Sequence, residues 1–412
     1  MRVRGLVMLA SCSLLPISAS TLARDLTLPQ AEQMLVDRNR ELQAARRAIE
    51  SADAQSLIAG ARPNPTLSLN STSLGPNARS DTVLRLDQPF ERGNKRELRL
   101  DAASGLQRAA RNDSLDVLRQ QIAALQGAYY DLKQAEERSQ VLAETAQLFS
   151  GTLSAAQRRL KAGDLAPADV AKVQVDFERA QNDARSAQAD RARAQIALAY
   201  LIGADQEAPE LRAVDPWPAP QRADAVAVED AIEARPDVVA AKARVEAAEK
   251  LRDLARAQRT RDVTVGAQYE VIQGGDPGSK TVGFGVAVPL FTGYDFSGDI
   301  QKAEVDRYAA MDALAKARAV ALGELRRAAG DLNASADRLE RFDASLLGAA
   351  TRSADASEFA FSRGAISVLE VLDARRTLRA VRLEALAARN DHAKALAAWR
   401  AAQSTVQSLE GR

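Results

Sequence analysis

Few side chains in this 412-residue sequence could support catalysis or metal binding. The sequence contains one cysteine, Cys12, and one histidine, His392. A Ser-His-Asp triad or a Cys-His pair would have to use His392, and a zinc or copper site of the usual Cys/His type cannot be built with a single imidazole. We predict an exposed helix position for His392, between Asp391 and Lys394. The sequence therefore predicts no enzyme, no metal site and no cofactor.

Two glycine turns are each followed by acidic residues. Both have the form Gly-x-[Leu/Ile], with an acid six residues after the glycine. The residues are Gly163-Asp164-Leu165 with Asp169, and Gly364-Ala365-Ile366 with Glu370 and Asp373. Glu370 and Asp373 are three residues apart, so they share one face of a helix. On residue type alone, such acids are typical of a solvated helix face.

The turns follow two very long predicted helices. Residues Asn94–Ala162 contain no proline and would form a helix of about 100 Å. Their apolar positions alternate three and four residues apart, which is the heptad spacing of a helix that packs lengthwise on others. The same spacing returns in residues Tyr294–Arg363. The chain is therefore predicted to be a tandem duplication of one unit.

Matching breakpoints define the order of elements within this unit. Each half reads as helix, β-hairpin, long helix, helix, and the breakpoints recur about 200 residues later. They are Pro89, Gly93 and Gly163, matched by Pro289, Gly293 and Gly364. The remaining long helices are predicted over Ala31–Ala61, Pro167–Ile202 and Val226–Gln258. We predict a first structural repeat over 24–203, a proline-rich linker over 204–225 and a second structural repeat over 226–412.

The first residues resemble an export signal. A basic start and an apolar run from Leu6 to Ile17 precede small residues that end at Ala23. This pattern predicts a signal peptide over 1–23. A rival interpretation makes Cys12 a lipidated first residue, because the residues before it resemble the lipobox of bacterial lipoproteins. In both cases we expect the mature chain to leave the cytoplasm.

Each half also carries a predicted β-hairpin. The strands are Thr66–Leu74 with Thr82–Gln88, and Val263–Ile272 with Thr281–Val288, around turn-rich loops over 75–81 and 273–279. Apolar residues alternate with small or polar ones, and strands of about nine or ten residues can cross a bilayer when tilted. The residues expected to face lipid are Leu84, Leu86, Val263, Val265, Tyr269, Val282, Phe284 and Val286.

Four strands cannot close a barrel, and an open edge in lipid leaves backbone donors and acceptors unpaired. Closure is therefore predicted to come from several copies, since two give eight strands and three give twelve, with room for a passage. The alternative is a small soluble four-stranded sheet between helical arms. It stays open because Ser71 and Ser73 interrupt the alternation that Leu67 and Leu69 begin. The predicted fold class is mainly α, with a β-barrel part in a membrane.

These features, in this duplicated order, resemble the TolC-type outer-membrane efflux channels. The resemblance covers nearly all of the sequence after residue 23. It lies in the start Leu26-Thr27-Leu28, the junction Ala61-Arg62-Pro63-Asn64-Pro65, the junctions 89–93 and 289–293, and the two glycine turns. It implies a homotrimer with a 12-stranded barrel in the outer-membrane lipid and an α-helical tunnel in the periplasm. It further implies a passive exit duct of a tripartite efflux system, with a periplasmic adaptor protein and an inner-membrane RND-type pump as partners.

The resemblance also implies roles for the two turns. In such channels the turns form the periplasmic tip, so residues 163–165 and 364–366 would dock the adaptor. Glu370 and Asp373, with Asp169, would line an acidic aperture, where the carboxylates of three copies would hold cations through a focused potential. Phe361 and Ile366 replace the aromatic hydroxyl and the arginine of the best-known members. The contacts that lock the tip are therefore expected to differ.

The exported cargo is indicated by one short motif. Residues 91–96, Glu-Arg-Gly-Asn-Lys-Arg, resemble the Glu-x-Gly-x-Lys-Arg stretch of the cobalt-zinc-cadmium and related heavy-metal branch, which is CzcC- and CusC-like. The resemblance implies export of heavy-metal cations in preference to drugs. Taken alone, the motif is typical of a charged helix start.

Two other classes of protein share parts of this pattern. A periplasmic adaptor also carries a helical hairpin and strands, although it would have one hairpin rather than duplicated breakpoints. A structural coiled-coil envelope protein without a pore would share the heptads. The net charge of +1 gives no indication of a nucleic-acid partner.

Overall fold

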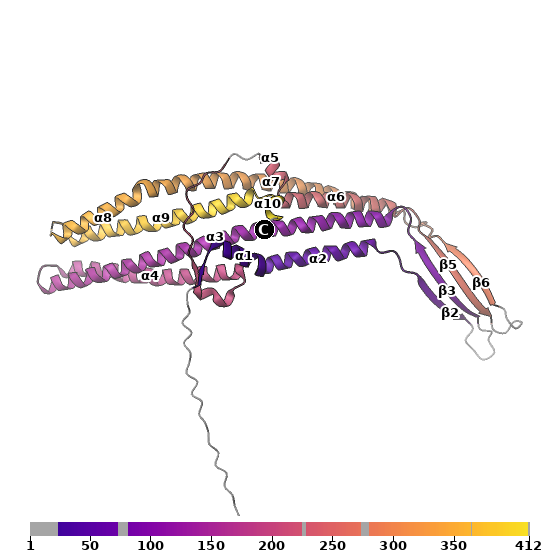
Figure 1. Cartoon of the computed structure of the whole chain (residues 1–412), viewed down its shortest axis with the longest axis horizontal. Helices are drawn as coiled ribbons and strands as arrows, with labels where there is room; N and C mark the ends of the chain where they lie inside the picture. Colours follow the sequence, from indigo (N-terminus) through magenta and orange to yellow (C-terminus); the bar gives the residue numbers. More distant parts are fainter. Residues whose placement is uncertain (1–23, 73–80, 225–227, 273–279, 364, 411–412) are drawn as a thin grey trace, which may run out of the picture.

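The structure, a computed structural model, describes residues 24–72, 81–224, 228–272, 280–363 and 365–410. The predicted signal peptide with Cys12, both hairpin loops except Asp81, and Gly364 lie outside the described residues. Long helices run side by side along the axis of an elongated molecule, and a β-sheet lies at one end (Figure 1). No helix among the described residues is long and apolar enough to cross a membrane.

The elements follow one order twice. In the first half they are α1 (Leu28–Arg38), α2 (Arg40–Gly60), β2 (Thr66–Thr72), β3 (Asp81–Phe90), α3 (Lys95–Lys161) and α4 (Pro167–Ile202). In the second half they are α5 (Val228–Glu233), α6 (Pro236–Ala257), β5 (Val263–Ile272), β6 (Lys280–Ala287), α7 (Ser297–Arg341), η2 (Phe342–Leu346), α8 (Leu347–Ser362), α9 (Val368–Ala402) and α10 (Val406–Glu410).

The predicted long helices are present, and two of them match almost residue for residue. α3 is 67 residues long. α4 begins at Pro167, where a proline at the first position loses no hydrogen bond, and ends before Gly203, whose φ of 64° favours glycine. α3 packs against α2, α4, α6 and α9, so it contacts helices of both halves.

Two predicted helices are each broken into two. The helix predicted over Ala31–Ala61 is interrupted at Asn39, whose backbone is extended and whose side-chain Oδ1 accepts hydrogen bonds from the N–H groups of Glu41 and Leu42. The helix predicted over Val226–Gln258 is interrupted before Pro236, because the residue before a proline is driven out of the helical region. The prediction of two continuous helices was therefore wrong.

The second long helix is not uniform either. Residues Phe342–Leu346 form a π-helical stretch between α7 and α8. A π-helical turn takes up an extra residue, which changes the direction in which all later side chains point. The heptad spacing of the sequence did not predict this change.

The segment between the halves, predicted as a proline-rich linker, contains regular structure. It forms a short 3₁₀ helix, η1 (Asp205–Glu210), and a strand, β4 (Leu211–Ala213), which pairs in parallel with β1 (Arg24–Leu26). The buried Tyr129 hydroxyl of α3 donates to the Leu26 carbonyl at 2.9 Å and accepts from the Asp215 N–H at 3.0 Å. Burial raises the pKa of the Tyr129 phenol, which therefore remains a donor.

His392 is fully buried, so the prediction of an exposed position was wrong. The Ser335 hydroxyl donates to the Leu332 carbonyl, so the Nδ1–H of His392 donates to Ser335 at 3.1 Å. Nε2 then accepts from the Gln221 N–H at 3.2 Å. Burial lowers the pKa of His392, which is consistent with a neutral ring that fastens the inter-repeat segment to α7 and α9.

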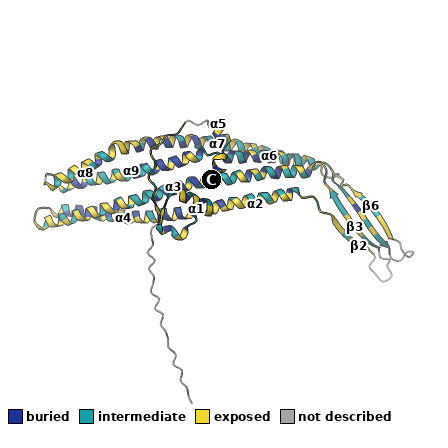
Figure 2. Ribbon diagram, in the orientation of Figure 1, coloured by how far each residue is buried: buried dark blue, intermediate teal, exposed yellow. Residues whose placement is uncertain are grey.

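The core is a narrow stripe along the helices rather than a central mass. Buried and exposed residues alternate along the whole length of the long helices (Figure 2), and in the middle of α3, over residues 112–137, most positions are buried or half-buried. Many of the buried residues are alanines, including Ala102 and Ala109 of α3 and Ala243 and Ala247 of α6. Small side chains let the helix axes approach closely, as expected for long helices packed lengthwise.

Candidate functional site

The four strands form one antiparallel sheet in the order β2-β3-β5-β6. In the register, Leu84 of β3 lies opposite Leu69 and Tyr269, and Tyr269 lies opposite Val282. Directly opposed residues share a face. All eight residues predicted to contact lipid therefore lie on one face, and Phe284 is 84% exposed. Leu67 and Leu69 of β2 also lie on this face. They were not among the residues predicted to face lipid, although they alternate with Ser68 and Asn70.

The opposite face of the sheet is polar. Arg85 and Asp87 form an ion pair there with a closest distance of 2.8 Å. Gly266 lies beside it, and a Cβ at this position would stand 2.2 Å from an oxygen of Asp87. The glycine therefore leaves room for the ion pair. The sheet thus separates an exposed apolar face from a charged one.

β2 and β6 are the two edges of this sheet, and within the chain each pairs on one side only. The β2 edge belongs to the first half and the β6 edge to the second. An unpaired edge presents a row of backbone donors and acceptors that another strand can use.

The two glycine turns lie at the other end of the molecule. Gly163 has a φ of 83°, and the Asp164 N–H donates to the Arg159 carbonyl at 2.9 Å, which caps α3. In the second turn the Ala365 N–H donates to the Ala360 carbonyl, also at 2.9 Å. Gly364 itself lies outside the described residues, and Ile366 is half-buried. The two turns therefore close with the same type of bond.

The acids proposed for an aperture begin the helices that follow these turns. Asp169 and Glu370 are each the third residue of their helix, where negative charge complements the helix dipole. Glu370 accepts from the Ser367 N–H at 2.9 Å in a capping box, and Asp169 pairs with Lys172 at 3.2 Å. Asp373 is exposed and forms no ion pair with a described residue. Glu370 and Asp169 thus have a structural role within the single chain.

Three arginines of α9 connect the helical hairpin formed by α8 and α9 to the hairpin formed by α3 and α4, near the glycine turns. Their partners on the other hairpin are Thr152 for Arg375, Asp176 for Arg376, and Asp183 for Arg379. Between the hairpins, Leu372 is fully buried in a cluster with Phe149 and Val173. These connections were not predicted, because each arginine is separated from its partner by about 200 residues and belongs to an ordinary charged helix face.

Phe361 lies near the end of α8, beside the second glycine turn. Its ring lies 5.0 Å from the guanidinium carbon of Arg159 on the other hairpin, a distance typical of a cation–π contact.

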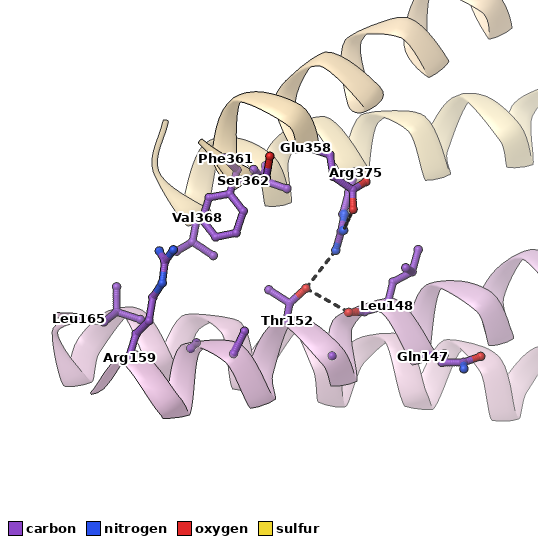
Figure 3. A pocket seen from close by; sticks show the side chains of 14 residues that line it. Gln147, Leu148, Thr152, Arg159, Leu165, Glu358, Phe361, Ser362, Val368 and Arg375 are labelled. Atoms are coloured by element: carbon purple, nitrogen blue, oxygen red, sulfur yellow. Dashed lines mark hydrogen bonds and ion pairs between the residues drawn. The ribbon is translucent and has the colours of Figure 1, made fainter. Parts of the chain in front are cut away.

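A cavity of about 450 Å³ lies between the two hairpins at this end (Figure 3). Leu148, Thr152 and Arg159 of α3 form one wall, and Glu358 and Phe361 of α8 lie across from them. The turn residue Leu165 lines the end of the cavity nearest the glycine turns (Figure 3).

The charged motif at residues 91–96 lies where the helices meet the sheet. Glu91 pairs with Arg99, and Arg96 and Arg99 donate to the last carbonyls of α2, those of Gly60 and Ala59. Lys95 is buried and pairs with Asp262 at 2.8 Å, directly before β5. These contacts give the motif a structural role that is independent of any cargo.

No group of three or more His, Cys, Asp or Glu side chains within the described ranges could hold a metal ion.

The chain thus combines long helical hairpins with a four-stranded sheet that has one exposed apolar face and two open edges. The family model for outer membrane efflux proteins matches residues 32–204 and 227–403, and the chain belongs to this family. The resemblance inferred from the sequence is thereby confirmed. Members of this family are efflux channel proteins, and no enzymatic activity is assigned to this chain on that basis.

The chain is similar to the cobalt-zinc-cadmium resistance protein CzcC of Cupriavidus metallidurans, with 26% identity over 91% of this chain and 89% of the relative. Among solved structures, CusC superposes with a TM-score of 0.79 at 18% identity and covers 93% of both chains. VceC of Vibrio cholerae superposes with a TM-score of 0.77 at 19% identity, over 92% of this chain and 96% of that one. The two structural likenesses establish the fold.

Proposed function

We propose that this chain is one subunit of a homotrimeric outer-membrane channel that acts as the passive exit duct of a tripartite efflux system. The observation that carries the proposal is the sheet, with its exposed apolar face and two unpaired edges. In lipid the β2 edge of one copy would pair with the β6 edge of the next, and three copies would close a 12-stranded barrel. The helices would form the periplasmic tunnel, and an inner-membrane pump would supply the energy through an adaptor.

Two matched substitutions test the membrane role of the sheet. Phe284→Arg places a charge on the apolar face and should cost roughly 2 to 4 kcal/mol near the bilayer midplane. Thr281→Arg places the same charge on the polar face, directly opposite Glu270 in the register, and should be tolerated. We expect only the first to abolish heat-modifiable trimers in outer-membrane fractions and single-channel conductance in planar bilayers. Equal behaviour of the two variants, or a wild-type protein without conductance, would contradict the proposal and favour a coiled-coil protein without a pore.

We further propose that the turns at Gly163 and Gly364 form the adaptor-docking tip, together with Asp164, Leu165, Ala365 and Ile366. Gly163 supports this role, because a Cβ there would meet nothing within 4 Å, so the turn is open to a partner. Bulky or charged replacements at both glycines should abolish export and leave trimers assembled. Intact export would place the docking surface elsewhere.

We also propose that Glu370, Asp373 and Asp169 line the aperture. Each of these acids would be present in three copies at the tip, one from each subunit. Because Glu370 also caps α9, its replacement by alanine alone would mix stability with permeation. Glu370→Gln keeps a capping side chain and removes the charge. Combined with Asp373→Asn, it should weaken block of the reconstituted channel by divalent cations. Unchanged block would remove the aperture proposal.

We propose heavy-metal cations as the cargo in preference to drugs, supported by the similarity to a cobalt-zinc-cadmium resistance protein over 91% of the chain. Deletion of the gene should sensitise cells to zinc, cobalt, cadmium or copper more than to drugs. Selective sensitivity to drugs would reverse this assignment.

A periplasmic adaptor is no longer a competing function, because the family match covers both halves.

A further inference from the structure

The cavity between the hairpins has features of a ligand site, and apart from Leu165 its lining includes none of the residues assigned to docking or to the aperture. Its volume of about 450 Å³ lies within the range of small-molecule sites, roughly 300 to 1,000 Å³. Much of its wall is apolar or small, with Leu148, Ala155, Val368 and Val371 among the lining residues. Gly151 also lines it, and a Cβ at this residue would meet nothing within 4 Å.

The charges around the cavity are not balanced. Arg375 is neutralised, since it donates to Glu358 at 2.7 Å and to the Thr152 hydroxyl at 3.0 Å (Figure 3). Arg159 forms no ion pair with any described residue, and its guanidinium lies over the Phe361 ring. Arg159, an exposed residue, is therefore a cation without an ion-pair partner among the described residues, beside an aromatic ring at a cavity with apolar and polar walls.

We propose that this cavity binds an amphipathic organic anion, an aromatic monocarboxylate whose ring system fills the apolar part and whose carboxylate pairs with Arg159. A guanidinium matches a carboxylate with two parallel hydrogen bonds. A single negative charge fits best, because the other lining cation, Arg375, is already paired with Glu358 and a second negative charge would stand close to that carboxylate. This ligand is distinct from the exported cargo, and its binding does not depend on pore formation.

Such a ligand would contact both hairpins at once. The walls come from α3 on one side and from α8 and α9 on the other. Because a ligand that binds only the folded arrangement stabilises it by mass action, occupancy should also raise the thermal unfolding midpoint of the helical part.

Calorimetric titration of the purified protein in nanodiscs, with empty nanodiscs subtracted, tests the ligand class. The ligands are 2-naphthoate, 2-naphthalenemethanol and 2-naphthylmethylammonium, which share a ring system and differ in charge. A charge-assisted pair contributes about 1.5 to 3 kcal/mol, so the carboxylate should bind at least about tenfold more tightly than the alcohol. Equal binding of acid and alcohol, or tighter binding of the ammonium ion, would overturn the proposal.

Two substitutions locate the site. Gly151→Leu fills the cavity and should abolish naphthoate binding. Gly330→Leu is the matched control, because Gly330 is also a helical glycine whose Cβ would meet nothing within 4 Å, but it lies on α7 and does not line the cavity. Arg159→Gln should remove the preference for the acid over the alcohol, and Arg159→Lys should restore part of it. Unchanged naphthoate binding in Gly151→Leu would place the site elsewhere and overturn the proposal.

Discussion

In both halves of the chain the first helix is interrupted at an equivalent position, but the residues that interrupt it are chemically different. In the first half, Asn39 caps α2 and its side-chain amide donates to the Leu201 carbonyl at the end of α4, at 2.9 Å. In the second half, Pro236 begins α6, and Arg235 before it is only 1% exposed. Arg235 donates to Asp237 at 2.7 Å and to Glu324 of α7 at 2.9 Å.

The comparison teaches that the fold requires the break, whereas the residues that make it can vary. In both halves the residue at the break also contacts the long helix of its own half, since Asn39 donates to Gln121 of α3 at 3.4 Å. The first break depends on neutral hydrogen bonds and the second on a buried charge. The two should therefore differ in their contribution to stability.

The largest effect is expected from Arg235→Ala. Removal of one partner from a buried ion pair typically costs 3 to 5 kcal/mol, and we expect about 3 kcal/mol here, because Asp237 and Glu324 reach solvent and can be partly hydrated. Chemical unfolding of the helical part, followed by circular dichroism, measures this loss. Arg222→Ala is the control, since its pairs with Asp337 and Glu340 are exposed and should contribute less than about 1 kcal/mol. Equal losses in both variants would refute the distinction between the two kinds of ion pair.

Asn39→Ala should have a smaller effect, about 1 to 2 kcal/mol, because it removes a helix cap and leaves the Leu201 carbonyl without the Asn39 amide. Asn39→Ser keeps the capping oxygen and should recover about half of the loss. The same unfolding measurement applies. A loss as large as that of Arg235→Ala would mean that the two breaks are energetically alike.

The smallest expected effect is a pH dependence of stability that arises from His392, which contacts the segment between the two halves. Burial holds the pKa of His392 below its unfolded value, so the unfolded chain binds a proton more readily than the folded one. The stability contributed by the neutral ring is therefore complete above about pH 7 and declines as the pH falls through the unfolded pKa of about 6.5. Unfolding midpoints measured between about pH 7.5 and 5.5 should show this decline in the wild type but not in His392→Gln. A decline of equal size in both proteins would assign it to other groups.

The sequence was sufficient to predict elements whose ends are marked locally. Pro167 and Gly203 bound α4, and the alternation of β5 predicted the strand Val263–Ile272 without error. The break before Pro236 had a local signal, the proline itself, which was not used in the prediction. The break at Asn39 carried one too, because asparagine is a preferred helix N-cap, but its partners Leu201 and Gln121 lie far away in the sequence and gave no signal.

The candidate site was likewise predictable only where a local sequence signal exists. The glycine turns and the apolar face of the sheet follow from spacing. The arginine pairs between the hairpins, the cation–π contact of Arg159 with Phe361, and the burial of His392 do not, because each depends on which helices become neighbours. A charged or aromatic residue on an amphipathic helix gives no indication of its partner until the packing is known.

The open sheet edges have a genetic consequence in the proposed ring. The β2 edge and the β6 edge are different surfaces, so every subunit must offer both to its neighbours. A copy with one damaged edge would leave a gap that its two sound neighbours could not seal. In a cell that produces both forms, a minority of damaged subunits would disable most of the pores, so edge alleles should be dominant.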